Sequence, residues 1–252
     1  MNQDVLTERR GPVLVITLNR PRTGNAFDRA MLGELARAFD LLETGSDLAA
    51  GVVTGTGRDF CVGADLRAGE EALRDMVLDV GSGVLGREVS KPLVAAVEGY
   101  ALGGGLELCL ACDLVVAARD ARLGLPEVRH GGIAAGGALL TLPRRVPYQI
   151  AAELALTGDI RPAEFFARWG LVNEVVDPGT SLTRAMDVAG RICGNSAIAT
   201  SATKRILQQS TAWPPGEAWE RQRAHVEPVL RSAGFTEGLR AFVEKREGMS
   251  PA

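Results

Sequence analysis

The fold is best read from the segment Gly99-Tyr100-Ala101-Leu102-Gly103-Gly104-Gly105-Leu106-Glu107. An apolar strand, Leu93–Val97, precedes this segment, and we expect its glycine-rich part to be a turn that leads into a helix over Leu106–Ala111. A second apolar strand follows at Leu114–Ala118. Strands that alternate with glycine turns and helices are typical of parallel sheets.

The same alternation continues on both sides of this segment. Val13–Leu18 is apolar almost throughout, as expected of a strand that is buried on both faces. Asp28 can cap a helix that reaches Leu42, and Ala49–Thr54 is a predicted strand. Leu171–Val176 is a further predicted strand. The sequence therefore predicts an α/β fold with largely parallel sheets.

Two regions depart from this alternation. The segment 67–90 begins with a helical pattern and then meets glycines at positions 81, 83 and 86, so we expect a helix followed by an irregular stretch. From about Ser181 onward the pattern is helical only, with Pro214-Pro215-Gly216 as a break. This tail predicts a helical appendage or an oligomer contact.

Composition is that of an ordinary globular protein. The 252 residues suit one large α/β domain, or one with a smaller helical appendage, and the 46% apolar content is enough for a sizeable core. The net charge of −3 gives no indication of an electrostatic nucleic-acid binder. The most apolar region, Ala101–Ala118, is interrupted by Glu107 and Asp113, so no membrane span is predicted.

The N-terminal residues and the cysteines indicate the cellular compartment that we expect for the protein. Residues 1–11 carry the charged side chains of Asp4, Glu8, Arg9 and Arg10 and no hydrophobic signal region, so we expect no export signal. The four cysteines of the chain are then expected to be thiols in a reducing cytoplasm.

The triple glycine suggests a binding site for an oxyanion or a phosphate. The first amides of a helix have no partner within the helix, and glycines allow another molecule to approach them closely. Glu107 follows Gly104 by three residues, which places its carboxylate on the same helical face. A carboxylate beside an oxyanion-binding amide suits proton transfer next to a carbonyl group. Alternatively, the glycines only permit close packing and Glu107 lies on a solvated face.

Other motifs fit the sequence poorly. No Gly-Lys-Ser/Thr follows the glycines, and the third glycine of the dinucleotide fingerprint is missing. The chain has two histidines and no Gly-x-Ser-x-Gly elbow, which argues against a serine triad. Two histidines without a dense cluster of ligands also argue against a catalytic metal. Cys109 and Cys112 form a lone Cys-x-x-Cys in an apolar helix, which favours core packing. Glu127, after Pro126, is either a buried functional acid or a loop charge.

Taken together, several segments resemble the crotonase (enoyl-CoA hydratase) superfamily. The similarity runs from about Val13 to Lys245, and its ordered motifs are far more specific together than any one alone. The motifs are Leu18-Asn19-Arg20-Pro21 with Asn25-Ala26, the segment from Gly57 to Leu66, the segment from Lys91 to Gly105, Ala111-Cys112-Asp113-Leu114, Leu156-Thr157-Gly158, and Gly170-Leu171-Val172-Asn173.

The resemblance implies a spiral of repeated strand–strand–helix (ββα) units with a C-terminal helical region that drives trimer formation. We expect residues 1–190 to form the spiral core with the acyl-CoA site, and residues 191–252 to form the oligomerisation region. Homotrimers often pair into homohexamers. The implied ligand is an acyl-CoA thioester, with no metal and no redox cofactor, because coenzyme A is part of the substrate.

The resemblance also implies roles for single residues. Ala64 and Gly104 match the positions whose backbone N–H groups form an oxyanion hole. Glu107 matches the glutamate that acts as a base on water, and Glu127 matches the acid that protonates the α-carbon. Arg22 and Arg58 are either phosphate partners or solvated surface charges. The expected contacts with coenzyme A and substrate are Arg22, Ala26, Val62, Asp65, Leu66, Tyr100 and Gly103.

Both glutamates favour hydration of a trans-2-enoyl-CoA to a 3-hydroxyacyl-CoA. An enoyl-CoA isomerase, an acyl-CoA dehydratase and a non-catalytic acyl-CoA-binding protein are the alternatives. The sequence departs from the family at Ala135, where many hydratases have glycine, and we expect a change in backbone freedom near the acyl site. Glu98 replaces a common asparagine, and we expect little effect from it.

Overall fold

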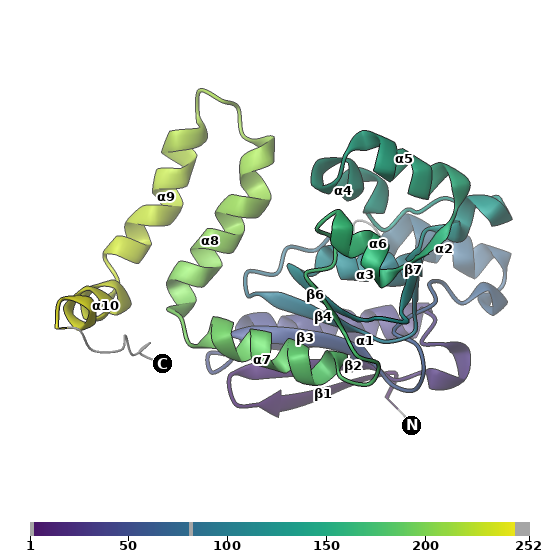
Figure 1. Cartoon of the computed structure of the whole chain (residues 1–252), viewed down its shortest axis with the longest axis horizontal. Helices are drawn as coiled ribbons and strands as arrows, with labels where there is room; N and C mark the ends of the chain where they lie inside the picture. The colour runs from purple at the N-terminus through teal and green to yellow at the C-terminus, as the bar shows by residue number, and fades with distance from the viewer. Residues whose placement is uncertain (1–2, 81–82, 245–252) are drawn as a thin grey trace.

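The computed structural model describes residues 3–80 and 83–244. Gly81 and Ser82, in the stretch expected to be irregular, and residues 245–252 lie outside the described residues. The larger sheet has six strands in the order β1-β2-β3-β4-β6-β9 (Figure 1). Its strands are β1 (Val5–Arg10), β2 (Val13–Leu18), β3 (Ala50–Gly55), β4 (Leu93–Val97), β6 (Leu114–Ala118) and β9 (Glu174–Val176).

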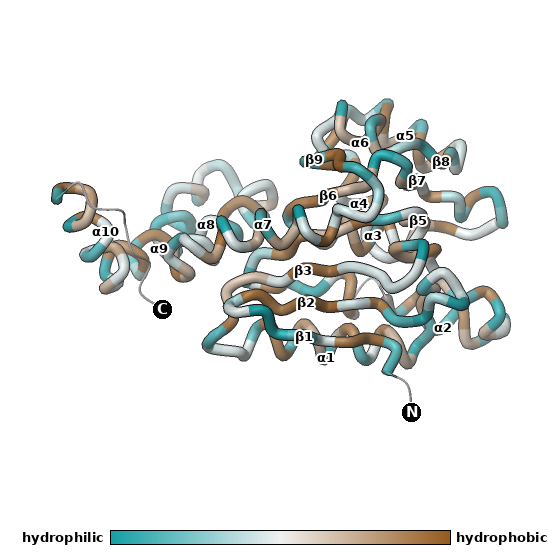
Figure 2. Tube along the Cα trace, turned by 60° about the horizontal axis from the view of Figure 1, so that its bottom comes forward, coloured by the Kyte–Doolittle hydropathy of each residue, from teal (hydrophilic) through white to brown (hydrophobic). Residues whose placement is uncertain are grey.

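Burial on both faces explains the continuous apolar runs of this sheet. β1 is antiparallel to β2, and every other neighbouring pair in the sheet is parallel. Leu14 and Ile16 of β2 face the main core, whereas Val13 faces a second cluster that includes Ala185 and Ala189. Figure 2 shows the apolar runs of β2 and β3 side by side. The predicted parallel α/β fold is confirmed, although the strand predicted over Leu171–Val176 is only β9.

A smaller sheet corrects the prediction of a simple turn over Gly99–Gly105. Its strands are β5 (Tyr100–Leu102), β7 (Arg122–Gly124) and β8 (Ile160–Pro162), so the turn itself contains a strand. Isolated bridges join Phe27 to Ala64 and Cys61 to Ala101 in the same parallel sense. In the larger sheet, each of the strands β2, β3, β4 and β6 is thus followed by a short extended segment that belongs to a second layer. This is the spiral that the family resemblance implied.

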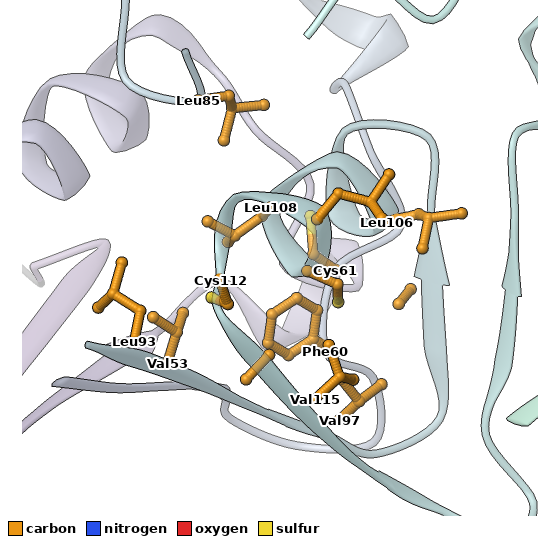
Figure 3. Packing of buried hydrophobic residues seen from close by; sticks show 14 of the residues in the cluster. Val53, Phe60, Cys61, Leu85, Leu93, Val97, Leu106, Leu108, Cys112 and Val115 are labelled. Carbon is orange, nitrogen blue, oxygen red and sulfur yellow. The ribbon is translucent and has the colours of Figure 1, made fainter. Parts of the chain in front are cut away.

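The helices cover the sheet according to their apolar faces. In α1 (Arg29–Thr44), Asp28 accepts a hydrogen bond from Met31 N, as predicted for a cap, at 2.9 Å. α3 (Gly104–Ala111) begins two residues before its predicted start and is buried on nearly all sides. Figure 3 shows Leu106 and Leu108 of α3 in the same buried cluster as Phe60. The remaining helices of the core are α2 (Glu70–Val80), α4 (Ala138–Arg145), α5 (Tyr148–Thr157) and α6 (Ala163–Arg168).

The C-terminal region is helical, as predicted. α7 (Ser181–Cys193) packs on the sheet, and α8 (Ala197–Gln209), α9 (Ala218–Leu230) and α10 (Ala233–Val243) extend away as an arm (Figure 1). Buried Lys204 ties α8 to the core through Asp113, 2.7 Å away. On the arm, Trp219 is 78% exposed and Phe242 is 82% exposed. Among the described residues, none of the helices has the length and hydropathy needed to cross a membrane.

Glu98 has a structural role that the sequence did not predict. Its two carboxylate oxygens accept hydrogen bonds from Gly179 N and Ser181 N, each at 3.1 Å. Thr180, the N-cap residue of α7, makes no side-chain cap. Glu98 therefore supplies the cap from a distant loop, and the expectation that it differs little from asparagine stays a prediction.

Candidate active site

The first segment of the site runs from Phe60 to Asp65 after β3. Cys61 N donates to Tyr100 O at 2.9 Å, and Leu102 N donates to Cys61 O at 2.9 Å, so the segment starts as a neighbour of β5. It then changes partner. Phe27 N donates to Gly63 O at 2.7 Å, and Asp65 N donates to Phe27 O at 2.8 Å. The amide of Ala64, between these two bonds, points to the opposite edge of the segment.

The second segment is the turn from β5 into α3. Gly103 N donates to Gly124 O at 2.9 Å, and Gly103 has φ 53° and ψ −121°, a conformation open to glycine. Gly104 is the first residue of α3, so its amide points out of the helix. Within residues 3–80 and 83–244, neither Gly104 N nor Ala64 N donates to a protein acceptor.

These two amides belong to adjoining segments. A β-carbon added at Gly63 would lie 3.5 Å from Gly104 N, and one added at Gly104 would lie 3.8 Å from Gly63 Cα. Two free backbone N–H groups in adjoining segments, one of them at a helix N-terminus, favour a negatively charged oxygen.

The triple glycine serves packing as well as the site. A β-carbon at Gly105 would lie 2.1 Å from Cys61 O, so only glycine lets α3 approach the first segment this closely. A β-carbon at Gly104 would lie 3.1 Å from the ring of Phe27. Both interpretations of these glycines therefore apply, because they permit close packing and also leave backbone amides accessible.

Glu107 is buried, with 5% of its surface exposed, and does not lie on a solvated face. It accepts a hydrogen bond from Ala138 N at 3.1 Å. Burial raises the pKa of Glu107 to about 7, the Ala138 amide opposes this shift, and the charge of Glu127 adds to it. Near neutral pH the carboxyl group can therefore both give and take a proton.

Glu127 lies on a short 3₁₀ helix, Pro126–His130, directly after β7. A β-carbon at Gly103 would lie 2.7 Å from Glu127 Oε1, so the carboxylate lies against the second segment. Its Oε2 is buried and makes no hydrogen bond in the part of the chain described. Burial raises the pKa of Glu127. The carboxylate is therefore shielded from solvent although the residue as a whole is partly buried, and its role as a functional acid stays a prediction.

The glycine-rich segment after Glu127 completes the surroundings of Glu107. A β-carbon at Gly136 would lie 2.4 Å from Glu107 Oε2 and 2.8 Å from Leu85 Cδ1, so a side chain here would displace the Glu107 carboxylate or Leu85. Ala135, in contrast, is exposed and does not have a positive φ. Alanine therefore fits this position without strain, and its effect on backbone freedom near the acyl site stays a prediction.

The other predicted contact residues flank the first segment. Val62 N donates to Gly24 O at 3.0 Å, which joins this segment to the loop that carries Arg22 and Ala26. Ala26 and Gly103 are buried, Val62 and Tyr100 are partly buried, and Arg22, Arg58 and Leu66 are exposed. The Asp65 carboxylate is buried and pairs with Arg20 and Arg67.

Sequence reasoning gave no role to Asn25, which is fully buried with φ 56°. Its side chain accepts from Arg20 N at 2.8 Å and donates to Asp59 O at 2.7 Å and Thr56 O at 3.0 Å. An asparagine in a turn is a signal for this backbone conformation. Its three partners depend on the tertiary structure, so no spacing in the sequence predicts them.

Comparisons with known proteins identify the family of the chain. The family model for enoyl-CoA hydratase/isomerase matches residues 8–249. The chain is 35% identical to enoyl-CoA hydratase EchA19 of Mycobacterium tuberculosis, over 96% of this chain and 94% of that protein. It is 38% identical to mevalonyl-coenzyme A hydratase sidH of Aspergillus fumigatus, over 93% and 90%. Carnitinyl-CoA dehydratase of Salmonella enteritidis is 35% identical over 98% of each chain.

A solved structure gives the same result for the fold. The crystal structure of an enoyl-CoA hydratase from Mycobacterium tuberculosis H37Rv superimposes with a TM-score of 0.93 and 45% identity, covering 99% of each chain. Sequence and fold agree along nearly the whole length, and the chain therefore belongs to the enoyl-CoA hydratase/isomerase family of the crotonase superfamily.

Proposed function

We propose that this protein is an enoyl-CoA hydratase, which adds water across the C2=C3 bond of a trans-2-enoyl-CoA and forms a 3-hydroxyacyl-CoA. The observation that carries the proposal is the pair of buried Glu107 and partly buried Glu127 beside two backbone amides that have no acceptor among the described residues. Relatives named as CoA hydratases, at 35% and 38% identity, support the same reaction class.

In this proposal the thioester carbonyl lies between the amides of Ala64 and Gly104. As water adds at the β-carbon, the π electrons move toward the carbonyl oxygen, and the resulting enolate is stabilised by the two N–H donors. One such donor is worth roughly 3 kcal/mol of the barrier in comparable sites. The positive end of the α3 dipole, at Gly104, adds to this stabilisation.

Glu107 and Glu127 carry the protons. Glu107 accepts a proton from the attacking water, whose oxygen bonds to the β-carbon, and Glu127 donates a proton to the α-carbon as the enolate collapses. The pair must hold one proton at the start. A raised pKa at both carboxyl groups favours a singly protonated pair near neutral pH.

Dehydration is the second candidate reaction, because the same singly protonated pair serves both directions. With the proton on Glu107, this residue can protonate a leaving hydroxide while Glu127 removes the α-proton. A pKa of about 7 at Glu107 suits this placement, and a relative at 35% identity is named carnitinyl-CoA dehydratase. Under reversible conditions, the equilibrium between substrate and product sets the direction.

We further propose that the active form is a homotrimer or a homohexamer. The arm α8–α10 exposes large apolar side chains, including Leu207, Trp219 and Phe242. Exposure of such side chains to water is unfavourable and marks a surface for contact with another protein chain. A second copy of the chain would cover them.

The experiment is a panel of trans-2-enoyl-CoAs of increasing chain length, followed by the loss of the enoyl-thioester absorbance. We expect turnover by the wild-type protein and a fall in kcat of roughly 10²–10⁴-fold in both Glu107→Gln and Glu127→Gln. Saturated acyl-CoA should still bind to both variants. A variant with near wild-type turnover would contradict the role of that residue.

The same panel separates the alternatives. Movement of the double bond without uptake of water would indicate an isomerase. Binding of acyl-CoA that raises the melting temperature, without conversion in either direction, would indicate a carrier.

A further inference from the structure

A single guanidinium group holds the loop after β2 against the first segment of the site. Arg20 Nη1 donates to Ala26 O at 2.7 Å and lies 2.8 Å from Asp28 Oδ2. Its Nη2 lies 3.0 Å from Asp65 Oδ2. Only 17% of the Arg20 side chain and 9% of the Asp65 side chain are exposed, so this pair is shielded from solvent.

The backbone of Arg20 is fixed as well. Arg20 N donates to Asn25 Oδ1 at 2.8 Å, and Asn25 N donates to Arg20 O at 3.0 Å. The Asn25 side chain also binds Asp59 O, in the loop that leads into the first segment. The guanidinium therefore reaches Asp65 from a rigid base.

Asp65 directly follows Ala64, whose amide has no protein acceptor in the described chain. Asp65 N donates to Phe27 O at 2.8 Å, so the backbone and the side chain of Asp65 are both held. The Ala64 N–H lies in the peptide plane that carries Gly63 O, which accepts a hydrogen bond from Phe27 N at 2.7 Å. Asp65 fixes the next peptide plane, so Ala64 is held between two fixed planes and its amide direction depends on both. A displacement of about 1 Å in such a donor can cost roughly 10²-fold in rate.

We propose that Arg20 is a positioning residue for the reaction, which aims the Ala64 amide at the thioester carbonyl by clamping Asp65. The proposal rests on the function proposed above. Arg20 touches no reacting atom in it. Its side chain acts through the carboxylate and the peptide plane of Asp65.

Arg67 offers a matched control on the same carboxylate. Its Nε donates to Asp65 Oδ1 at 2.9 Å and its Nη2 to Asp65 Oδ2 at 3.1 Å, but its side chain is 68% exposed to solvent. Loss of Arg67 leaves the shielded Arg20–Asp65 pair in place. A second control is Arg184, which makes a bidentate ion pair with Glu174 on β9, away from the site. Arg184→Gln removes an ion pair without changing the first segment.

The test uses butyryl-CoA carrying ¹³C at the carbonyl, a saturated thioester that cannot be hydrated. Infrared difference spectra report the strength of the hydrogen bonds to the bound carbonyl. We expect the wild-type protein to move the carbonyl band to lower frequency and Arg20→Gln to lose at least half of that movement. In the hydration assay, kcat should fall roughly 10- to 100-fold with little change in KM. Arg67→Gln and Arg184→Gln should keep the wild-type band, and Arg20→Lys should recover part of it.

The outcomes separate this proposal from the proposed function. A folded Arg20→Gln protein with the wild-type band and kcat would overturn the role of Arg20. If Arg20→Gln does not fold, Asp65→Asn decides in its place, because it removes the same ion pair with little change in size. A wild-type protein that moves the band but hydrates no enoyl-CoA would disprove the hydratase function, while the band of the variants would still decide the role of Arg20.

Discussion

Replacing Gly103 by alanine tests the geometry of the site most directly. At Gly103 the backbone has φ 53° and ψ −121°, which an L side chain adopts at a cost of roughly 1–3 kcal/mol. The new β-carbon would lie 2.7 Å from Glu127 Oε1, about 0.7 Å closer than the 3.4 Å of an ordinary contact. The Glu127 carboxylate must therefore move by nearly 1 Å, or the turn must open.

Two effects are expected from Gly103→Ala. The strain of roughly 1–3 kcal/mol should lower the melting temperature by roughly 2–12 °C, given 2–4 °C for each kcal/mol in a chain of this size. The displaced carboxylate should lower kcat for enoyl-CoA hydration by roughly 10²-fold. Thermal unfolding and the absorbance assay measure the two effects on the same protein.

Gly170→Ala separates strain from displacement. Gly170 has φ 76°, and nothing lies within 4 Å of the position of its β-carbon. This variant should lose roughly 2–6 °C in melting temperature and keep its kcat. The reasoning fails if Gly103→Ala keeps more than half of the wild-type kcat, or if the two variants lose the same share of activity.

Three further predictions concern charge, capping and thiols. The pKa of Glu107 is raised from 4.5 to about 7, so the folded state loses about 3 kcal/mol of stability as the pH rises through this range. The melting temperature of Glu107→Gln should therefore exceed that of the wild type at pH 8, and by much less at pH 5. Glu98→Ala should cost about 1 kcal/mol through loss of the α7 cap, seen in urea unfolding with turnover unchanged. Cys61 and Cys112 are buried, and burial raises the pKa of each thiol to about 12. A thiol reagent at pH 8 should therefore modify half-buried Cys193 first and react with Cys61 and Cys112 only after unfolding. Early labelling of Cys61 would contradict the packing of α3.

The local elements were predictable because their signals are local. Val13–Leu18 is a strand with the predicted bounds, since its apolar run has no solvent-facing side, and Asp28 caps α1 as its side-chain chemistry suggests. β5 was missed because three residues between glycines carry too short a pattern to separate a strand from a turn. Its hydrogen bonds come from distant segments, which no window of sequence contains.

The candidate site was predicted mainly through resemblance. Chemistry alone indicated Gly104 and Glu107, because an open helix N-terminus and a carboxylate one turn later lie within a single motif. Ala64 and Glu127 carried no local signal of their own. Their places depend on the Phe27 bridge and on the close approach of Glu127 to Gly103, both of which are long-range contacts.

The sequence by itself determined the alternation of strands and helices, the helical C-terminal region and the family. These follow from periodicity, turn chemistry and ordered motifs, which are properties of neighbouring residues. Only the tertiary structure decided that Glu107 is buried with a raised pKa, that Glu98 caps α7, and that Arg20 clamps Asp65. Burial and the pairing of charges depend on which distant segments meet, and the parallel spiral sets those meetings.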